Sequence, residues 1–383
     1  MDRKEFLKNS LFATGAILLP SSVWALNENL NGKPEFSYTN PFVPIWCEGD
    51  DYSQAIIKPT IFYKEVLGTK IEIENMPAYK TQSDLGDCKA FSLAAILQQY
   101  VNTKWKSDIP DPKNPPADMA ISHFGLMAYT NQAREIDNTL QFNQKNGRGI
   151  DDIIDSLSMK GNRLILENCK PFENLTKRFS LNGQKGLQLR DEFLNYLKEI
   201  YLNLKNTNEQ NIKDYTKEIN KLNEFVSLNF NLKTFKKALT KYSYDEFLYT
   251  LFFDDCKMEN FPSGFRAAAF PLDSMNVTPK EVKQQIIKGL NRYKPVLLSL
   301  CVSQNKGNEC EGSHLLVIDG FKQVKHENVI KDIFKIHNSW GVEWQRKNND
   351  GWIDADILTQ NTVQVKNDDG SYRIGSASVI WLD

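Results

Sequence analysis

The most informative stretch of this chain reads Gln82-Ser83-Asp84-Leu85-Gly86-Asp87-Cys88-Lys89-Ala90-Phe91-Ser92. Apolar residues after Cys88 recur at helical spacing, so a helix is expected to begin at the cysteine itself. A cysteine in the first turn of a helix lies at the positive end of the helix dipole, which favours the thiolate. A buried cysteine that merely caps a core helix is the ordinary alternative. Two motifs far downstream favour a catalytic role for Cys88 instead.

These motifs are Gly312-Ser313-His314 and His337-Asn338-Ser339-Trp340-Gly341. With the first stretch they complete a set of groups for acyl transfer to a thiol. Cys88 would be the nucleophile, His314 its base, and Asn338 the group that orients the imidazole. The side-chain amide of Gln82, six residues before Cys88, would donate to the oxyanion. Trp340 would shield the hydrogen bond between histidine and asparagine from water.

The other three histidines are expected to be structural, because none has a partner motif beside it. His123 lies in a predicted helix and His326 in a polar hairpin. His337 alternates to the opposite face of its strand from Asn338.

The ordered motifs resemble the papain family of cysteine peptidases, in its bacterial branch, over most of residues 70–383. The resemblance implies an α+β class and a two-lobed fold, with a helical lobe and an antiparallel barrel-like lobe. It implies catalytic roles for Cys88, His314, Asn338 and Gln82. It also implies substrate-binding roles for Gly147, Gly149 and Trp340, with no cofactor and no metal. Lys89 departs from the family pattern, which has tryptophan beside the nucleophile.

The function that the resemblance implies is an exported cysteine peptidase that hydrolyses peptide bonds through an acyl-thioenzyme, with proteins or peptides as substrates. One alternative is another acyl transfer on the same pair of residues, such as ligation or deamidation. A second alternative is a catalytically silent peptide-binding scaffold. Asp87 and Lys89 beside the nucleophile keep that second alternative open, although no catalytic residue is replaced.

The spacing between the motifs predicts an insertion. Cys88 and His314 are 226 residues apart, against about 130–150 in the family. Between Cys169 and Cys256, apolar residues at helical spacing predict a helical hairpin followed by one or two shorter helices. We place this insertion at about 173–256. Its apolar faces could bind a membrane or a protein partner, but packing as a core beneath a solvated face is favoured.

Further elements are expected on either side of the insertion. Helices are predicted at about 124–135 and 150–160, and buried strands at 295–300, 315–321 and 333–336. A disulfide between Cys169 and Cys256 would tie off the base of the insertion, and one between Cys301 and Cys310 would staple a loop beside His314. The sequence does not fix this connectivity.

The N-terminus reads as an export signal over residues 1–25. It has a basic start, an apolar centre from Leu11 to Leu19, and the small-residue site Val23-Trp24-Ala25. Residues 26–70 would be a short pro-region or part of the folded domain, and residues 71–383 the peptidase domain. The expected location is periplasmic or secreted, with no stable membrane anchor after signal removal.

The net charge of the chain argues against one class of partner. The 383 residues carry 47 basic and 48 acidic side chains, a formal net charge of −1. Because no strongly basic face follows from this balance, nucleic acid is not an expected partner.

Overall fold

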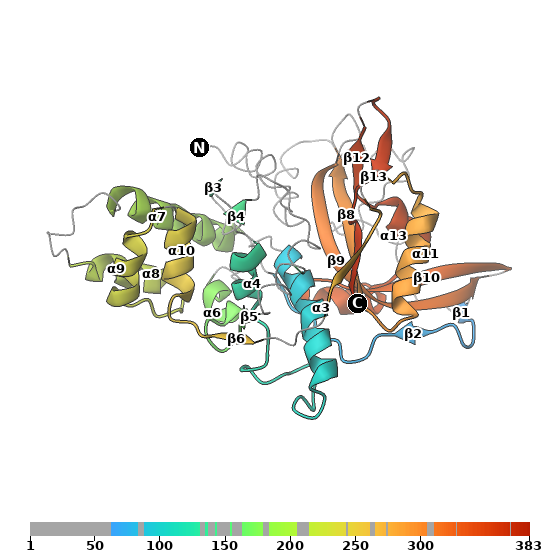
Figure 1. Cartoon of the computed structure of the whole chain (residues 1–383), viewed down its shortest axis with the longest axis horizontal. Coiled ribbons are helices and arrows are strands. Elements are labelled where there is room, and N and C mark those ends of the chain that lie inside the picture. The colour runs from blue at the N-terminus through green and yellow to red at the C-terminus, as the bar shows by residue number, and fades with distance from the viewer. Residues whose placement is uncertain are drawn as a thin grey trace.

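The chain folds into a mixture of helices and antiparallel strands, an α+β structure (Figure 1). The computed structural model describes residues 63–82, 88–130, 135–136, 142–143, 154, 163–178, 184–204, 214–242, 244–260, 265–272, 275–304, 310–326, 328–367 and 369–383. The signal prediction for residues 1–25 and the glycine turn at 147–149 lie outside these residues.

The described helices fall into two groups along the chain, α3 to α10 before strand β7 (Ala267–Phe270) and α11 to α13 after it. They are α3 (Cys88–Lys104), α4 (His123–Thr130), α6 (Phe172–Thr176), α7 (Gln184–Leu204), α8 (Thr216–Phe225), α9 (Leu232–Leu239), α10 (Tyr244–Phe253), α11 (Pro279–Leu290), α12 (Gly341–Lys347) and α13 (Ala355–Gln360), with a 3-10 turn η3 at Asn349–Gly351.

Within the described ranges, the strands form one large sheet and three small ribbons. They are β1 (Tyr63–Glu65), β2 (Ile71–Glu72), β3 (Glu135–Ile136), β4 (Phe142–Asn143), β5 (Arg163–Ile165), β6 (Met258–Asn260), β7 (Ala267–Phe270), β8 (Val296–Gln304), β9 (Cys310–His326), β10 (Val329–His337), β11 (Trp352–Asp354), β12 (Gln364–Lys366), β13 (Tyr372–Ile374) and β14 (Val379–Leu382).

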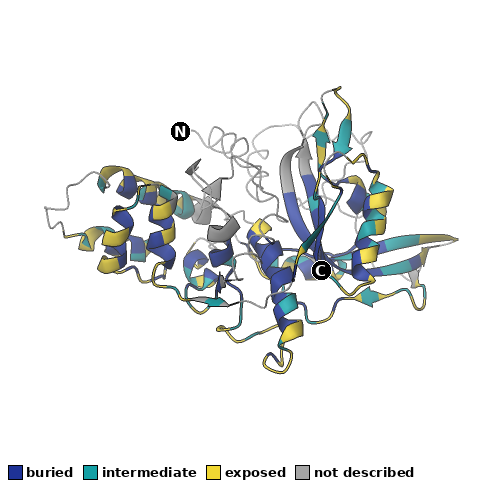
Figure 2. Cartoon of the chain, viewed as in Figure 1, coloured by how far each residue is buried: buried dark blue, intermediate teal, exposed yellow. Residues whose placement is uncertain are grey.

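The large sheet has the strand order β11-β10-β9-β8-β14-β7, and β1 and β2 also pair with β9. Its central strands are apolar on both faces; Leu315, Leu316, Val317 and Ile318 of β9 are all buried. A continuous apolar run is expected when both faces of a strand are covered. Helices α3 and α11 both contact β8 and β9 and lie on either side of the sheet (Figure 1). Figure 2 shows the resulting core as the dark centre of this region.

Helices α7 to α10 gather at the end of the molecule away from the sheet (Figure 1). The predicted hairpin corresponds to α7 and α8, and the two shorter helices to α9 and α10. Asn231 caps α9 by accepting a hydrogen bond from the backbone N–H of Thr234. This helical group is not a separate appendage, because Phe124 of α4 packs at 5.1 Å and 4.7 Å, ring centre to ring centre, from Phe252 and Phe253 of α10.

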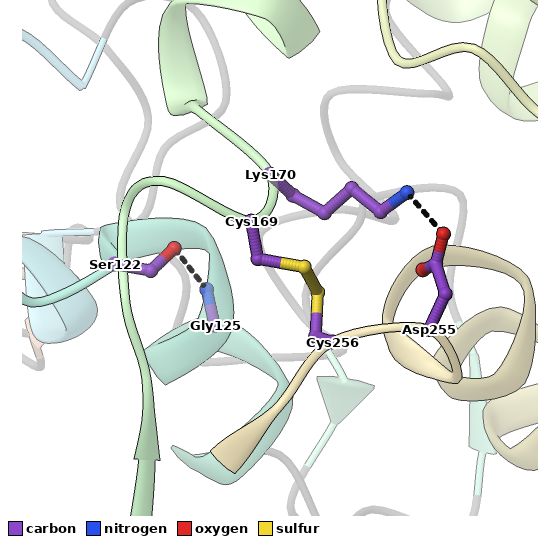
Figure 3. The surroundings of a disulfide bond; sticks show 6 residues. All are labelled: Ser122, Gly125, Cys169, Lys170, Asp255 and Cys256. Carbon is purple, nitrogen blue, oxygen red and sulfur yellow. Dashed lines mark hydrogen bonds and ion pairs between the residues drawn. A yellow bond between two sulfur atoms is a disulfide. The ribbon is translucent and has the colours of Figure 1, made fainter. Parts of the chain in front are cut away.

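A disulfide joins Cys169 to Cys256, as predicted (Figure 3). Beside it, the ammonium group of Lys170 lies 3.1 Å from a carboxylate oxygen of Asp255. The bond closes a loop of 87 residues that carries α6 to α10. Cys301 is also disulfide-bonded. The side chain of Cys310 is not described, so the pairing of Cys301 with Cys310 stays a prediction.

Two local predictions need correction. Helix α4 ends at Thr130, and Glu135 lies in strand β3 rather than in the predicted helix. Strand β9 does not begin after His314 but at Cys310, because pairing with β8 extends it beyond the apolar run. The predicted helix at 150–160 lies almost wholly outside the described residues. The boundaries proposed at residues 25 and 70 stay predictions, although β1, from the second segment, pairs with β9 in the main sheet.

Within the described ranges, none of the helices is both long enough and apolar enough to span a bilayer.

Candidate active site

Cys88 is the first residue of α3 and is fully buried. Its Sγ accepts a hydrogen bond from the backbone N–H of Leu315 at 3.3 Å. One helical turn later, the Ser92 hydroxyl donates to the backbone oxygen of Leu315 at 2.8 Å. The N-terminus of α3 is therefore clamped to β9 at the residue that directly follows His314. Cys88 is not part of a disulfide.

His314 and Asn338 come from neighbouring antiparallel strands, β9 and β10. Nε2 of His314 lies 2.9 Å from Oδ1 of Asn338, and the same oxygen accepts from the backbone N–H of Ser339 at 2.8 Å. Because Nε2 is hydrogen-bonded to Asn338, Nδ1 is the ring nitrogen that can exchange a proton with a thiol. The ring of Trp340 stacks on the imidazole at 5.0 Å between ring centres, with 29° between the planes.

Burial sets the electrostatics of the imidazole. Only 1% of His314 is exposed, and burial lowers the pKa of His314 to about 4, although the hydrogen bond to Asn338 acts in the opposite direction. In this closed arrangement the ring is therefore neutral near pH 7. A charged imidazolium would require an opposite charge such as a thiolate at close range, which offsets the loss of hydration.

Gln82 is held against the strand that carries Asn338. Its backbone N–H donates to the Ser339 carbonyl at 2.8 Å, and the Ser339 hydroxyl donates to Gln82 Oε1 at 2.5 Å. The amide oxygen is thus engaged, and no described group accepts a hydrogen bond from the buried Nε2. Such an amide nitrogen is a donor that can bind a developing negative charge.

Gly341 joins the same two chain segments, a short distance after Ser339. It has φ +82°, a left-handed conformation that glycine adopts without strain. Its N–H donates to the backbone oxygen of Lys80 at 3.0 Å. The glycine that ends the Asn-Ser-Trp-Gly string therefore lets the chain turn back onto the segment that leads to Gln82.

The structure brings four predicted catalytic residues and one predicted substrate-binding residue into one region, namely Gln82, Cys88, His314, Asn338 and Trp340. Their catalytic roles stay predictions. The other substrate-binding candidates, Gly147 and Gly149, lie outside the described residues, as does the side chain of Ser313.

Two groups near the site had no role in it predicted from the sequence. Asp319 and His337 are both buried, and His337 Nδ1 lies 3.6 Å from Asp319 Oδ2. The available signal was an acidic residue inside an otherwise apolar strand run, which costs free energy unless a polar partner is present.

In the described part of the chain, Cys169, Asp255 and Cys256 bring three potential metal-ligand atoms together. The two sulfur atoms are bonded to each other, so neither is a thiolate, and Asp255 is paired with Lys170.

Neither a protein-family model nor a curated protein matches the chain. Among solved structures, one that matches comes from work on the limited antibody cross-reactivity between the mite allergens Blo t 1 and Der p 1. The match covers 100% of this chain and 81% of that chain, with 12% sequence identity and a TM-score of 0.37. A TM-score this low does not assign a family to the chain.

Proposed function

We propose that this chain is a papain-like cysteine peptidase that hydrolyses peptide bonds through an acyl-thioenzyme. The observation that carries the proposal is the alignment of Asn338 Oδ1 with His314 Nε2 at 2.9 Å, on a strand whose next residue, Leu315, donates to the Cys88 sulfur. A thiol, an imidazole and an orienting amide in that order form the arrangement that activates a cysteine nucleophile.

The first half of the reaction would form the acyl-enzyme. His314 takes the proton from Cys88, and the thiolate attacks the carbonyl carbon of the scissile bond. The carbonyl oxygen becomes an oxyanion that accepts a hydrogen bond from Gln82 Nε2. Collapse breaks the carbon–nitrogen bond, and the imidazolium returns the proton to the leaving amine.

The second half would release the enzyme. Water loses a proton to His314 as its oxygen attacks the thioester carbon, and the carbon–sulfur bond then breaks. The proton returns to sulfur, so the thiol and the neutral imidazole are restored. Asn338 keeps the ring in one orientation throughout, and the stacked ring of Trp340 covers that hydrogen bond.

Two arrangements beyond the site belong to the same proposal. We assign α3 and the helices between α3 and β7 to a helical lobe, and the sheet with His314 and Asn338 to the second lobe of a papain-like fold. We also propose that the protein is exported; the disulfide between Cys169 and Cys256 supports this, because disulfides persist in oxidising compartments.

Covalent labelling tests the proposal. An epoxide-type thiol inhibitor should modify Cys88 in the wild type, and the Cys88→Ala variant should neither be labelled nor cleave a peptide mixture. The Ser92→Ala variant is a matched control on the same helix, because it loses a bond to Leu315 but keeps the thiol.

The outcomes separate the alternatives. New peptide termini indicate hydrolysis, joined peptides indicate ligation, and glutamine converted to glutamate indicates deamidation. A binding scaffold would bind peptide equally well with or without the Cys88 thiol and release no product. Substantial turnover by the Cys88→Ala variant would disprove the mechanism.

A further inference from the structure

Strand β9, which carries His314, contains an irregularity a few residues after that histidine. In its pairing with β10, Gly320 lies opposite Lys335, and Ile318 lies opposite Ile336. Asp319 is therefore an extra residue without a cross-strand partner, a β-bulge. Bulges re-aim side chains and are common beside active sites.

The bulge leaves Asp319 facing His337. Asp319 is 5% exposed and His337 6% exposed, and Nδ1 of the histidine lies 3.6 Å from a carboxylate oxygen of the aspartate. Burying a carboxylate without a polar partner is costly, so this contact offsets part of the cost of burial. The backbone of Asp319 is held as well, because its carbonyl accepts from the N–H of Ile73 at 2.8 Å.

His337 is connected to the three segments that carry Asn338, Gln82 and His314. It directly precedes Asn338 in the chain. Its ring lies 4.5 Å, centre to centre, from the ring of Tyr79, three residues before Gln82. Through Asp319 it contacts β9, the strand that carries His314.

We propose that His337 and Asp319 are positioning residues for the thiol site, a role that rests on the proposed function. The pair fixes the end of β10, and so sets the distance and angle at which the Asn338 oxygen meets the imidazole of His314. Contact with Tyr79 couples the same histidine to the segment that presents the Gln82 amide. Misplacement by about 1 Å at such a site costs as much as 100-fold in rate.

The test uses substitutions that separate shape from polar contact. His337→Phe keeps a ring against Tyr79 but removes the nitrogen that faces Asp319. His337→Asn keeps an amide nitrogen near the Nδ1 position, and Asp319→Asn keeps the shape of the carboxylate without its charge. Ile333→Val, a buried substitution elsewhere on the same strand, is the control for loss of stability alone.

Two measurements are made on each folded variant: kcat and KM for a peptide, and the rate at which iodoacetamide alkylates Cys88. His337→Phe should lower kcat about tenfold, the lower end of the effect seen when a group that orients a site residue is lost, with KM nearly unchanged. The alkylation rate should fall in parallel. His337→Asn should recover part of both losses, and Ile333→Val should show neither.

Unchanged kcat and alkylation in folded His337→Phe would overturn the inference, as would an equal loss in Ile333→Val. If His337→Phe fails to fold, Asp319→Asn decides: a fall in both rates supports the pair, and unchanged rates exclude it. Alkylation of Cys88 needs no peptide substrate, so it reads the positioning role even if the wild type proves not to be a peptidase. Failure of the proposed function would appear instead as absent peptide turnover with normal, His337-dependent alkylation.

Discussion

The side-chain oxygen of Asn338 serves two donors at once, Nε2 of His314 at 2.9 Å and the N–H of Ser339 at 2.8 Å. The hydrogen bond from the Ser339 N–H fixes the side-chain amide of Asn338, and this amide in turn fixes the orientation of the His314 ring. Because the asparagine side chain is fully buried, its position depends on this local bonding rather than on water.

Asn338→Ala should therefore lower kcat about 10- to 100-fold, since one hydrogen bond to a buried group is worth about 1–3 kcal/mol. The thiol and base remain, so the loss should be smaller than in Cys88→Ala. Asn361→Ala is the matched control, because Asn361, the C-cap residue of α13, is also buried but donates its amide hydrogen bond to the Ile357 carbonyl. Equal losses of kcat in the two alanine variants would argue against an orienting role.

Gln82→Ala should lower kcat by about 100- to 1,000-fold with little change in KM, as expected for the loss of an oxyanion donor. Ser339→Ala should be milder, because the amide remains but loses the hydroxyl that holds Oε1. Gln98→Ala, at another buried glutamine, on α3, controls for destabilisation. Steady-state kinetics on one peptide suffices, and a change confined to KM would contradict the oxyanion assignment.

The disulfide between Cys169 and Cys256 should contribute about 4–5 kcal/mol to the free energy of unfolding, on the entropy of closing its 87-residue loop. Replacing both cysteines by alanine and measuring urea unfolding tests this value. Because α10 shares a core with α4 through Phe124 and Phe252, the loss should appear in one cooperative transition. Separate unfolding of residues 172–253 would instead show that the helical group is an independent unit.

Stability should fall in acid because the half-buried His123 and the buried His314 resist protonation. Burial lowers the pKa of His123 to about 3 and that of His314 to about 4, both from 6.5. Below about pH 6.5 the unfolded chain binds protons that the folded chain does not, so the free energy of unfolding decreases as pH falls toward 4. Urea unfolding at several pH values should show that the free energy of unfolding falls less steeply with decreasing pH in His123→Gln than in the wild type. An equal pH dependence in the two proteins would refute the role of His123.

Glu167 should change the free energy of unfolding in the opposite direction over an overlapping pH range. Burial raises the pKa of Glu167 from 4.5 to about 7, so the folded state keeps a proton that the unfolded chain releases. Its contribution to stability is full below about pH 4.5 and is lost as pH rises through 7. Glu167→Gln should remove that loss in the same titration, which distinguishes the carboxyl from the histidines.

Local periodicity determined much of this protein. Helical spacing after Cys88 predicts α3, and the apolar runs after Lys294, around Val317 and before Asn338 predict β8, β9 and β10. Each pattern reflects which neighbours along the chain are buried. The spacing of Cys169 and Cys256 around the helical segment likewise led to the correct disulfide.

Tertiary structure alone decided how the site groups meet. The Gln82 amide and the Ser339 hydroxyl are 257 residues apart, and no periodicity records their hydrogen bond. The bulge at Asp319 is equally hidden, because a strand's alternation shows which faces are buried but not where its pairing slips against a neighbour. Contacts between distant residues depend on the packed arrangement of whole strands and helices, so they appear only once the chain has folded.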